Sequence, residues 1–193
     1  SFGGSSIRRR LLKSRRSGTK VVVSGQRNVD RRRQALVTEI LPPHNVKLPV
    51  WQFSAVESRA HHGAHFDDAR AELDPRVASR MARADGVTGI EFARTIAARE
   101  ALIARAAHLF GDTPVALPSV AIMPPKLDDL REDATYDRIN LLALRNTSFA
   151  NVIDGCSVSM PITSHPGAGL MLTATAGRDA MLINMAETLQ GAL

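Results

Sequence analysis

The sequence is poor in cysteine, in aromatic residues and in long apolar runs. Cys156 is the one cysteine among 193 residues, so neither a disulfide nor a metal site built from several cysteines can form within the chain. Aromatic residues make up 4%, and no apolar run approaches the roughly 20 residues that cross a membrane. We therefore expect a globular protein of a reducing compartment, the cytoplasm, without a membrane partner.

Acidic residues are almost missing from the beginning of the chain. Residues 1–33 hold 11 Lys or Arg against one acid, Asp30, whereas residues 34–193 hold 14 against 18. A block of like charges is typical of a solvated, disordered tail that attracts phosphate without a fold. Phe2 is the one aromatic residue before Trp51, so nucleic-acid binding through 8–33 would lack stacking rings and would not be specific. We predict a basic segment over 1–33, disordered or misjoined, and one globular domain over 34–193.

Helices are predicted from capping residues and apolar periodicity. In a capping box, a Ser or Thr and a Glu three residues later satisfy each other's backbone amides. Ser54 with Glu57 predicts a helix over 55–70, and Thr88 with Glu91 predicts a longer one that ends before Gly111. Two further helices are predicted, over 75–85 and from 179 to the apolar stripe of Leu182, Met185, Ala186 and Leu189.

Short apolar or alternating stretches predict four strands between these helices. They lie at 34–40, 115–123, 156–161 and 168–174, and residues 131–137 read as a polar connection. Prolines follow the first strand and bound the second, as expected where strand ends enter loops. Helices that cover a few buried strands make an α/β domain.

The order of these elements carries a resemblance to a known family. The stretch Ala143–Leu189 runs through Arg-Asn-Thr-Ser-Phe-Ala-Asn, Pro161 and Gly169 to a closing amphipathic helix. Together with the long helix and the apolar strand before it, this stretch resembles the C-terminal portion of an amidase signature hydrolase, from about residue 36 to residue 189. The resemblance implies a truncated amidase signature fold, a mixed β-sheet covered by helices.

The last predicted strand departs from the family in two places. The family commonly shows an aliphatic-Gln-aliphatic pattern followed by Gly, where this chain has Leu170-Met171-Leu172 and then Ala174. Met fills such a space with apolar atoms, and Ala is the smallest side chain after Gly. The departures concern details of the pocket and leave the predicted fold unchanged.

The family hydrolyses linear amide carbon–nitrogen bonds through a serine acyl-enzyme, with a second serine in a cis peptide and a lysine. The resemblance thus implies an amidase with a small-molecule amide substrate and no cofactor. Gly3-Gly4-Ser5-Ser6-Ile7-Arg8 is similar to the family's nucleophile segment. By this match Ser6 is the candidate nucleophile, Ser5 is the fallback, and Gly3 and Gly4 form the turn whose amides face the oxyanion. A flexible leader is the other interpretation of these residues.

The beginning of the chain departs from the family more seriously. Phe2 stands where an acid is favoured, Arg10 where a proline is, and the basic run over 9–33 replaces a core segment. Neither the loop with the cis-serine nor the strand-borne lysine is present, so we expect the chain to be inactive alone. The alternative is a non-catalytic remnant whose Arg-rich tail binds nucleic acid or an acidic partner, a binding that salt would weaken steeply.

Other candidate residues have simpler structural explanations beside the functional ones. Asn146 and Thr147 fall in the loop that the resemblance places near the substrate side of the sheet, and they are candidates for lining the pocket or for building a turn. His61 and His65 have metal-binding spacing but no evident third ligand, so a surface helix is favoured. Cys156 with His165 as base is less favoured than a thiol buried on a strand, and no metal site is predicted.

Overall fold

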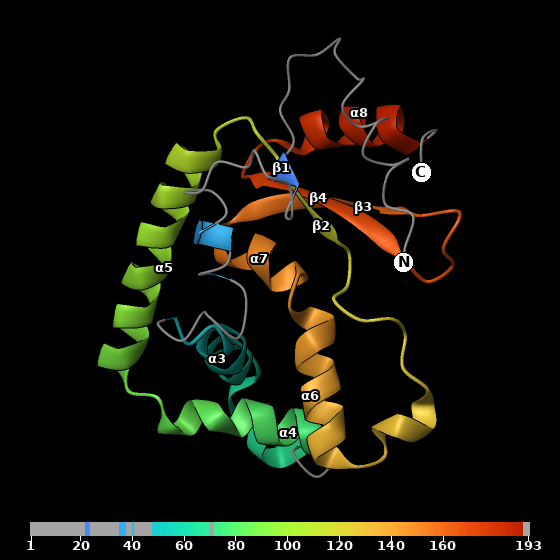
Figure 1. Ribbon diagram of the computed structural model, residues 1–193. Helices are drawn as coiled ribbons and strands as arrows, with labels where there is room; N and C mark the ends of the chain where they lie inside the picture. The colour runs from blue at the N-terminus through green and yellow to red at the C-terminus, as the bar shows by residue number, and fades with distance from the viewer. Residues whose placement is uncertain (1–21, 24–34, 38–39, 41–47, 70–71, 191–193) are drawn as a thin grey trace. The chain divides into compact units, whose positions relative to one another are not determined.

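The computed structural model describes residues 22–23, 35–37, 40, 48–69 and 72–190. The chain divides into two compact units. We call residues 1–44 and 103–193 the sheet unit, and residues 45–102 the helical unit. Helix α5 (Gly89–Phe110) contributes residues to both (Figure 1).

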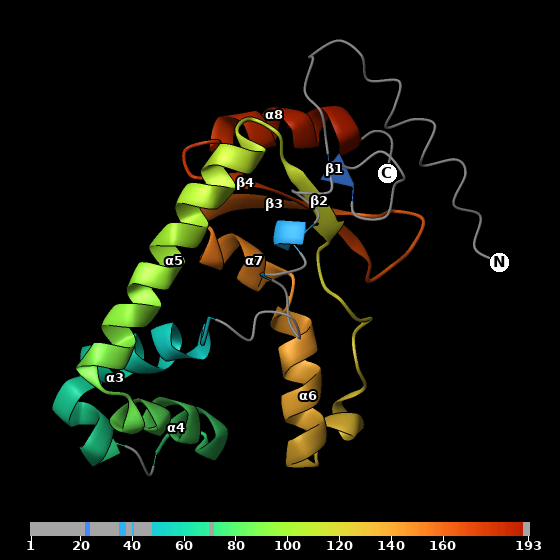
Figure 2. The same ribbon diagram turned by 60° about the vertical axis from the view of Figure 1, so that its left-hand side comes forward.

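The sheet unit is built on four strands in the order β1-β2-β4-β3. Strands β1 and β2 are parallel, whereas β2 with β4 and β4 with β3 are antiparallel. Helix α8 lies over one face of this sheet and α7 lies on the other, as the two ribbon views show (Figures 1 and 2). The bounds are β1 (Val22–Val23), β2 (Val115–Pro118), β3 (Gly155–Pro161), β4 (Gly169–Thr175), α7 (Thr147–Val152) and α8 (Asp179–Gln190).

The sheet face under α8 is apolar because alternate residues of its strands pack against the predicted apolar stripe of that helix. Register pairs Ala116 with Leu172 and Leu172 with Val158, so these side chains share one face. Ala116 and Leu172 form a core cluster with Leu182, Ala186 and Leu189, against which Val158 and Met185 pack. The predicted apolar stripe of the closing helix is therefore confirmed.

The opposite face is apolar near β2 and polar at the outer strand. Val115 and Leu117 are buried, and the ring of Phe149 in α7 packs edge to face on Phe110 with centroids 6.1 Å apart. On β3 the same face carries the exposed residues Ser157 and Ser159. This change from apolar to polar places hydroxyl groups along the outer strand.

The helical unit consists of α3 (Trp51–Ala69), α4 (Pro75–Ala82), the 3-10 turn η1 (Arg83–Gly86) and the first part of α5. The predicted capping box is present: the Glu91 carboxylate accepts from the Thr88 amide at 2.9 Å, and the Thr88 hydroxyl accepts from the Glu91 amide at 3.2 Å. Asp74 caps α4 by accepting from the Arg76 amide at 2.8 Å. The helix predicted over 75–85 is thus confirmed as α4 and η1.

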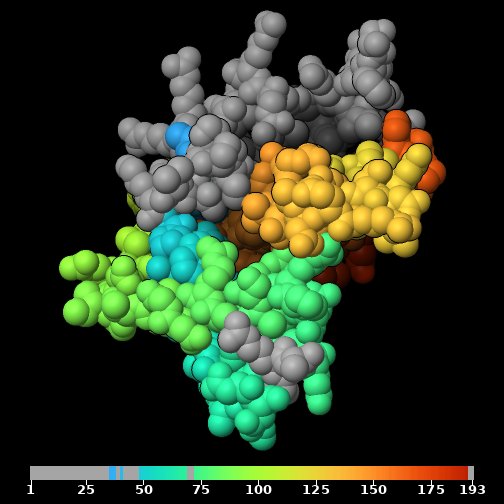
Figure 3. Space-filling view, turned by 90° about the horizontal axis from the view of Figure 1, so that it is seen from below, coloured from blue at the N-terminus to red at the C-terminus, as the bar shows by residue number. Residues whose placement is uncertain are grey.

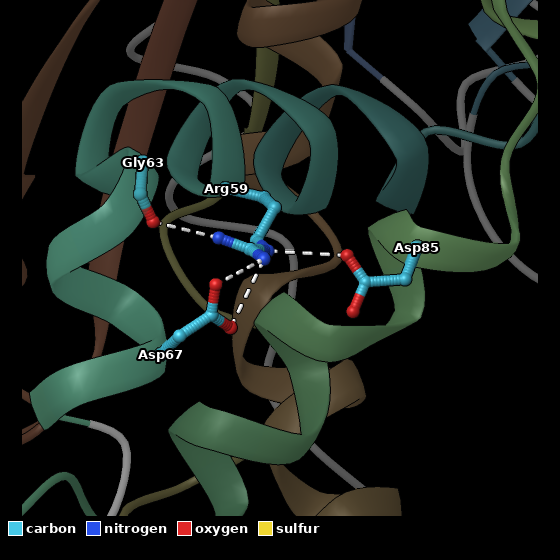
Figure 4. A network of polar contacts seen from close by, with 4 residues as sticks. All are labelled: Arg59, Gly63, Asp67 and Asp85. Carbon is cyan, nitrogen blue, oxygen red and sulfur yellow. Dashed lines mark hydrogen bonds and ion pairs between the residues drawn. The ribbon is translucent and has the colours of Figure 1, made fainter.

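Arg59 holds the kinked helix α3 together (Figure 4). Gly63 leaves the helical conformation with φ 48°, which a residue without a Cβ adopts readily. Arg59 donates to the Gly63 carbonyl at 2.7 Å and pairs with Asp67 and Asp85, both at 3.1 Å. Hydrogen bonding to Asp85 is the largest cause that raises the pKa of Arg59. One guanidinium therefore joins both sides of the kink to η1.

Three sequence predictions about elements are wrong. The strand expected over 34–40 is helical at residues 35–37 and 40. A short apolar run fits the spacing of a helix as well as that of a strand, so the pattern alone does not distinguish them. The connection expected over 131–137 contains the start of α6 (Asp133–Leu144), which Glu132 caps by accepting from the Ala134 and Thr135 amides. Ser54 does not cap α3; its hydroxyl donates to the Trp51 carbonyl inside the helix.

Two helix caps make stability depend on pH. The Thr88 amide, then its hydroxyl, lowers the pKa of Glu91, and the Thr135 side chain and amide lower the pKa of Glu132. Both carboxylates therefore favour folding above the ordinary glutamate pKa of about 4.3, and this contribution is lost as the pH falls through the lowered folded-state pKa.

We expect Glu91→Gln and Glu132→Gln to flatten the fall of the unfolding free energy with pH in this acidic range. Neutral side chains no longer distinguish the folded from the unfolded state by proton uptake. Urea titrations at a series of pH values measure the effect, with Glu187→Gln on the exposed side of α8 as the matched control. Equal slopes for all three variants would contradict this account of the caps.

Candidate functional site at the end of strand β2

A buried asparagine fixes the carboxyl end of β2. Asn146 lies between α6 and α7 and is 1% exposed. Its Nδ2 donates to the Pro118 carbonyl at 2.8 Å, and its Oδ1 accepts from Arg145 Nε at 3.1 Å. Both ends of the carboxamide are used, which satisfies the requirement that buried polar groups find partners.

Two serine hydroxyls meet directly beyond this anchor. Ser119 follows Pro118, and its Oγ lies 2.5 Å from the Ser159 Oγ on β3. The Ser119 amide donates to the Gly169 carbonyl at 2.8 Å. A Cβ on Gly169 would lie 2.6 Å from the Ser119 Oγ, so the missing side chain is what lets the hydroxyl sit over the β4 backbone. We call Ser119, Arg145, Asn146 and Ser159 the polar cluster.

The polar cluster is reachable from solvent. Ser159 is exposed, and Ser119 and Arg145 are half-buried. The segment from β2 to α6, yellow to orange in Figure 3, lies at the surface of the sheet unit, with Leu127 84% and Leu141 67% exposed. The cluster therefore offers a cation, hydroxyl donors and hydroxyl acceptors to a small polar ligand.

The described residues supply no activated nucleophile. Lys126, an exposed residue before the 3-10 turn η2 (Leu127–Leu130), is the one lysine among them. A serine hydroxyl is a weak nucleophile without a positioned base. The chemistry that the polar cluster can perform is binding and orientation by hydrogen bonds and charge.

The structure describes some of the site residues that the sequence predicts, but not all of them. Gly3, Gly4, Ser5 and Ser6 lie outside the described residues. Asn146 is buried in the sheet unit, whereas its neighbour Thr147 is exposed and donates its hydroxyl to the Leu144 carbonyl at 3.0 Å. Thus Asn146 acts on the end of β2 from within, and Thr147 forms a local helix-end contact.

The other candidate residues form no catalytic arrangement. Cys156, half-buried at the start of β3, packs against the core under α8, and His165 lies beyond the opposite end of that strand. His61 and His65 are exposed on either side of the Gly63 kink. Within the described ranges, no three His, Cys, Asp or Glu side chains gather as metal ligands, and no helix has the length and apolarity to cross a membrane.

Comparison with known proteins relates this chain to carbon–nitrogen hydrolases. It is 34% identical over 137 residues to the 2-amino-5-chloromuconic acid deaminase of Comamonas testosteroni, a match that covers 69% of this chain and 30% of the deaminase. No family model matches the chain. Two solved structures share the fold: an amidase (18% identity, TM-score 0.60) and an allophanate hydrolase of Kluyveromyces lactis (16%, TM-score 0.63).

The chain belongs to the amidase signature family. It spans about a third or less of the relatives it matches: 30% of the deaminase, 34% of the amidase and 25% of the allophanate hydrolase, while the two structures cover 74% and 82% of this chain. The expected α/β amidase signature fold is confirmed.

Sequence reasoning missed most of the polar cluster of this amidase signature chain. Ser119 and Ser159 are 40 positions apart, and they meet because β2 and β3 both flank β4. The alternation of Ser157 and Ser159 indicates a polar strand face, but no local sequence pattern predicts which strand brings Ser119 to that face. Arg145 is the sequence neighbour of the candidate Asn146, but it belongs to no motif that would predict a role for it.

We expect Asn146→Ala to destabilise the protein by about 1–3 kcal/mol, because it leaves the Pro118 carbonyl without its donor. Thr147→Ala is the matched control and should change the unfolding free energy by less than about 0.5 kcal/mol, as is usual for an exposed substitution. Urea unfolding measures both. Similar values for the two variants would show that Asn146 does not anchor β2.

Proposed function

We propose that this amidase signature chain is part of an enzyme that hydrolyses a carbon–nitrogen bond in a small molecule. The sequence match to a deaminase carries the proposal, because removal of an amino group and cleavage of an amide both break such a bond with water. The substrate class is a small amide, or an amine-bearing acid of the kind named for the deaminase. The described residues contribute a scaffold and the polar cluster.

The part that the described residues play in the proposed reaction is inferred from the groups that they lack. They offer hydrogen-bond donors, hydrogen-bond acceptors and a cation at the end of β2, but no serine paired with a lysine base. Covalent chemistry therefore requires groups outside them. Positioning by the scaffold remains valuable, since a misplacement of about 1 Å can cost about a hundredfold in rate.

Ser6 is the proposed nucleophile, with Gly3 and Gly4 in the turn that faces the oxyanion and Ser5 as the fallback. The motif similarity of residues 3–8 supports this assignment. A serine-directed fluorophosphonate followed by intact mass tests it. An adduct that disappears in Ser6→Ala would identify the nucleophile, and an equal adduct in both chains would exclude Ser6. No adduct in either chain would favour the non-catalytic remnant.

An exchange of segments tests the proposed function. The 137 matched residues of the deaminase are replaced by those of this chain, and ammonia release from 2-amino-5-chloromuconic acid is measured. We expect activity within about a hundredfold of the parent deaminase, because a substrate-side scaffold with the same fold keeps the reacting groups nearly in place.

The same exchange carrying Asn146→Ala is the control and should lose most of that activity together with stability. The proposal would be wrong if the unmutated exchange and the parent deaminase both unfold cooperatively, yet the exchange releases no ammonia. Cooperative unfolding shows that the scaffold has formed, so the absence of activity could not be explained by misfolding.

A further inference from the structure

We propose that the polar cluster binds the carboxylate group of the substrate, with Arg145 as the cation and the Ser119–Ser159 pair as the hydroxyl donor. This inference rests on the proposed function and deepens it, because it names a carboxylate as a required part of the small substrate. The role is one of positioning, and no bond to the carboxylate is made or broken.

Arg145 is held in place through one nitrogen of its guanidinium. Its Nε donates to the Asn146 Oδ1 at 3.1 Å, and the buried carboxamide is fixed in turn by the Pro118 carbonyl. The two terminal nitrogens of the guanidinium take no part in this bond and together form a fork that matches a carboxylate. A guanidinium fixed by its Nε loses less side-chain entropy when it binds.

The charge of Arg145 is unused among the described residues. Arg59, Arg131 and Arg178 each pair with an aspartate there, at 3.1, 2.7 and 2.6 Å. Arg145 has no carboxylate partner within the same described ranges, although it is half-buried. A half-buried cation gains from an anionic partner more than a solvated one does, because solvent screens it less.

The serine pair supplies the complementary donor. When two hydroxyls share one hydrogen bond, one proton lies between them and the other remains free to donate outward. The proton that is shared polarises the second hydroxyl and strengthens its outward bond. The 2.5 Å separation of the two oxygens therefore leaves a donor at a solvent-reachable position next to Pro118, the residue whose carbonyl Asn146 binds.

The cation and the serine pair are linked through one carboxamide. Asn146 contacts Arg145 with one end and Pro118 with the other, and Ser119 is the next residue after Pro118. Because the carboxamide is buried and bonded at both ends, the cation and the hydroxyl pair keep a fixed relation within the sheet unit. A carboxylate is an anion that can accept from both a guanidinium fork and a hydroxyl.

Binding of adipate, a six-carbon dicarboxylate, to the full chain tests the inference. The dissociation constant is measured by NMR titration of the ¹⁵N-labelled protein, following the Arg145 Nε–H resonance, with the neutral adipamide as the uncharged comparison. We expect adipate to shift this resonance and to bind more tightly than adipamide.

The variants separate the cation from the hydroxyls. Arg145→Gln should weaken adipate binding about tenfold or more, which is the loss expected for a charge-assisted pair. The adipate affinity of Arg145→Lys should lie between those of the parent and of Arg145→Gln, since lysine keeps the charge but lacks the fork. Ser159→Ala should weaken binding a few-fold. Arg131→Gln, which removes an exposed arginine paired with Asp128, is the matched control and should bind as the parent does.

Two results would overturn the inference: equal weakening by Arg145→Gln and Arg131→Gln, or equal affinity for adipate and adipamide. The measurement involves no turnover, so it fails separately from the proposed function. If adipate binds through Arg145 but the segment exchange is inactive, the carboxylate site is supported and the hydrolase proposal is contradicted. If the exchange is active but adipate binding does not depend on Arg145, the hydrolase proposal is supported and the carboxylate site is contradicted.

Discussion

The two hydrogen bonds of the Asn146 carboxamide are the interaction on which the functional end of the sheet unit depends. One bond fixes the last carbonyl of β2 and the other fixes the side chain of Arg145. A buried carboxamide that lost either partner would face the cost of an unsatisfied polar group, so the two bonds hold each other in place. The side chain of Arg145 and the end of β2 that precedes Ser119 are both fixed by this single buried group.

The sheet makes this arrangement possible because its two faces differ. Under α8 the strands present apolar residues to Leu182, Ala186 and Leu189, which supplies the burial that stabilises the unit. On the other face, burial around Phe149 gives way to hydroxyls at the outer strand β3. The apolar face thus provides a rigid base, and the polar edge remains available for a ligand.

Much of the fold was predictable from local patterns in the sequence. The Thr88 and Glu91 capping box and the stripe of α8 each depend on residues within a few positions of one another, so sequence alone identified them. The start of α6 was missed because Glu132 is not among the side chains that usually begin helices. The strand predicted over 34–40 was wrong because its apolar residues fit a helix equally well.

The site was predictable only in part. Asn146 is predicted from the sequence as a candidate for lining the pocket or for building a turn, and the structure shows it buried with its carboxamide bonded to Pro118. The pairing of Ser119 with Ser159 depends on the register of three strands, which no single stretch of sequence encodes. The family resemblance, in contrast, rested on the order of elements and was confirmed by the sequence match to the deaminase.

The exchange rate of the Asn146 side-chain amide protons with solvent is the most direct test of this account. Buried, hydrogen-bonded amides exchange only when the structure opens, so we expect these protons to exchange far more slowly than those of the exposed Asn184 on α8. A nuclear Overhauser contact from the Asn146 amide to Ser119 should accompany the slow exchange. Exchange as fast as that of Asn184 would contradict the claim that Asn146 anchors the end of β2.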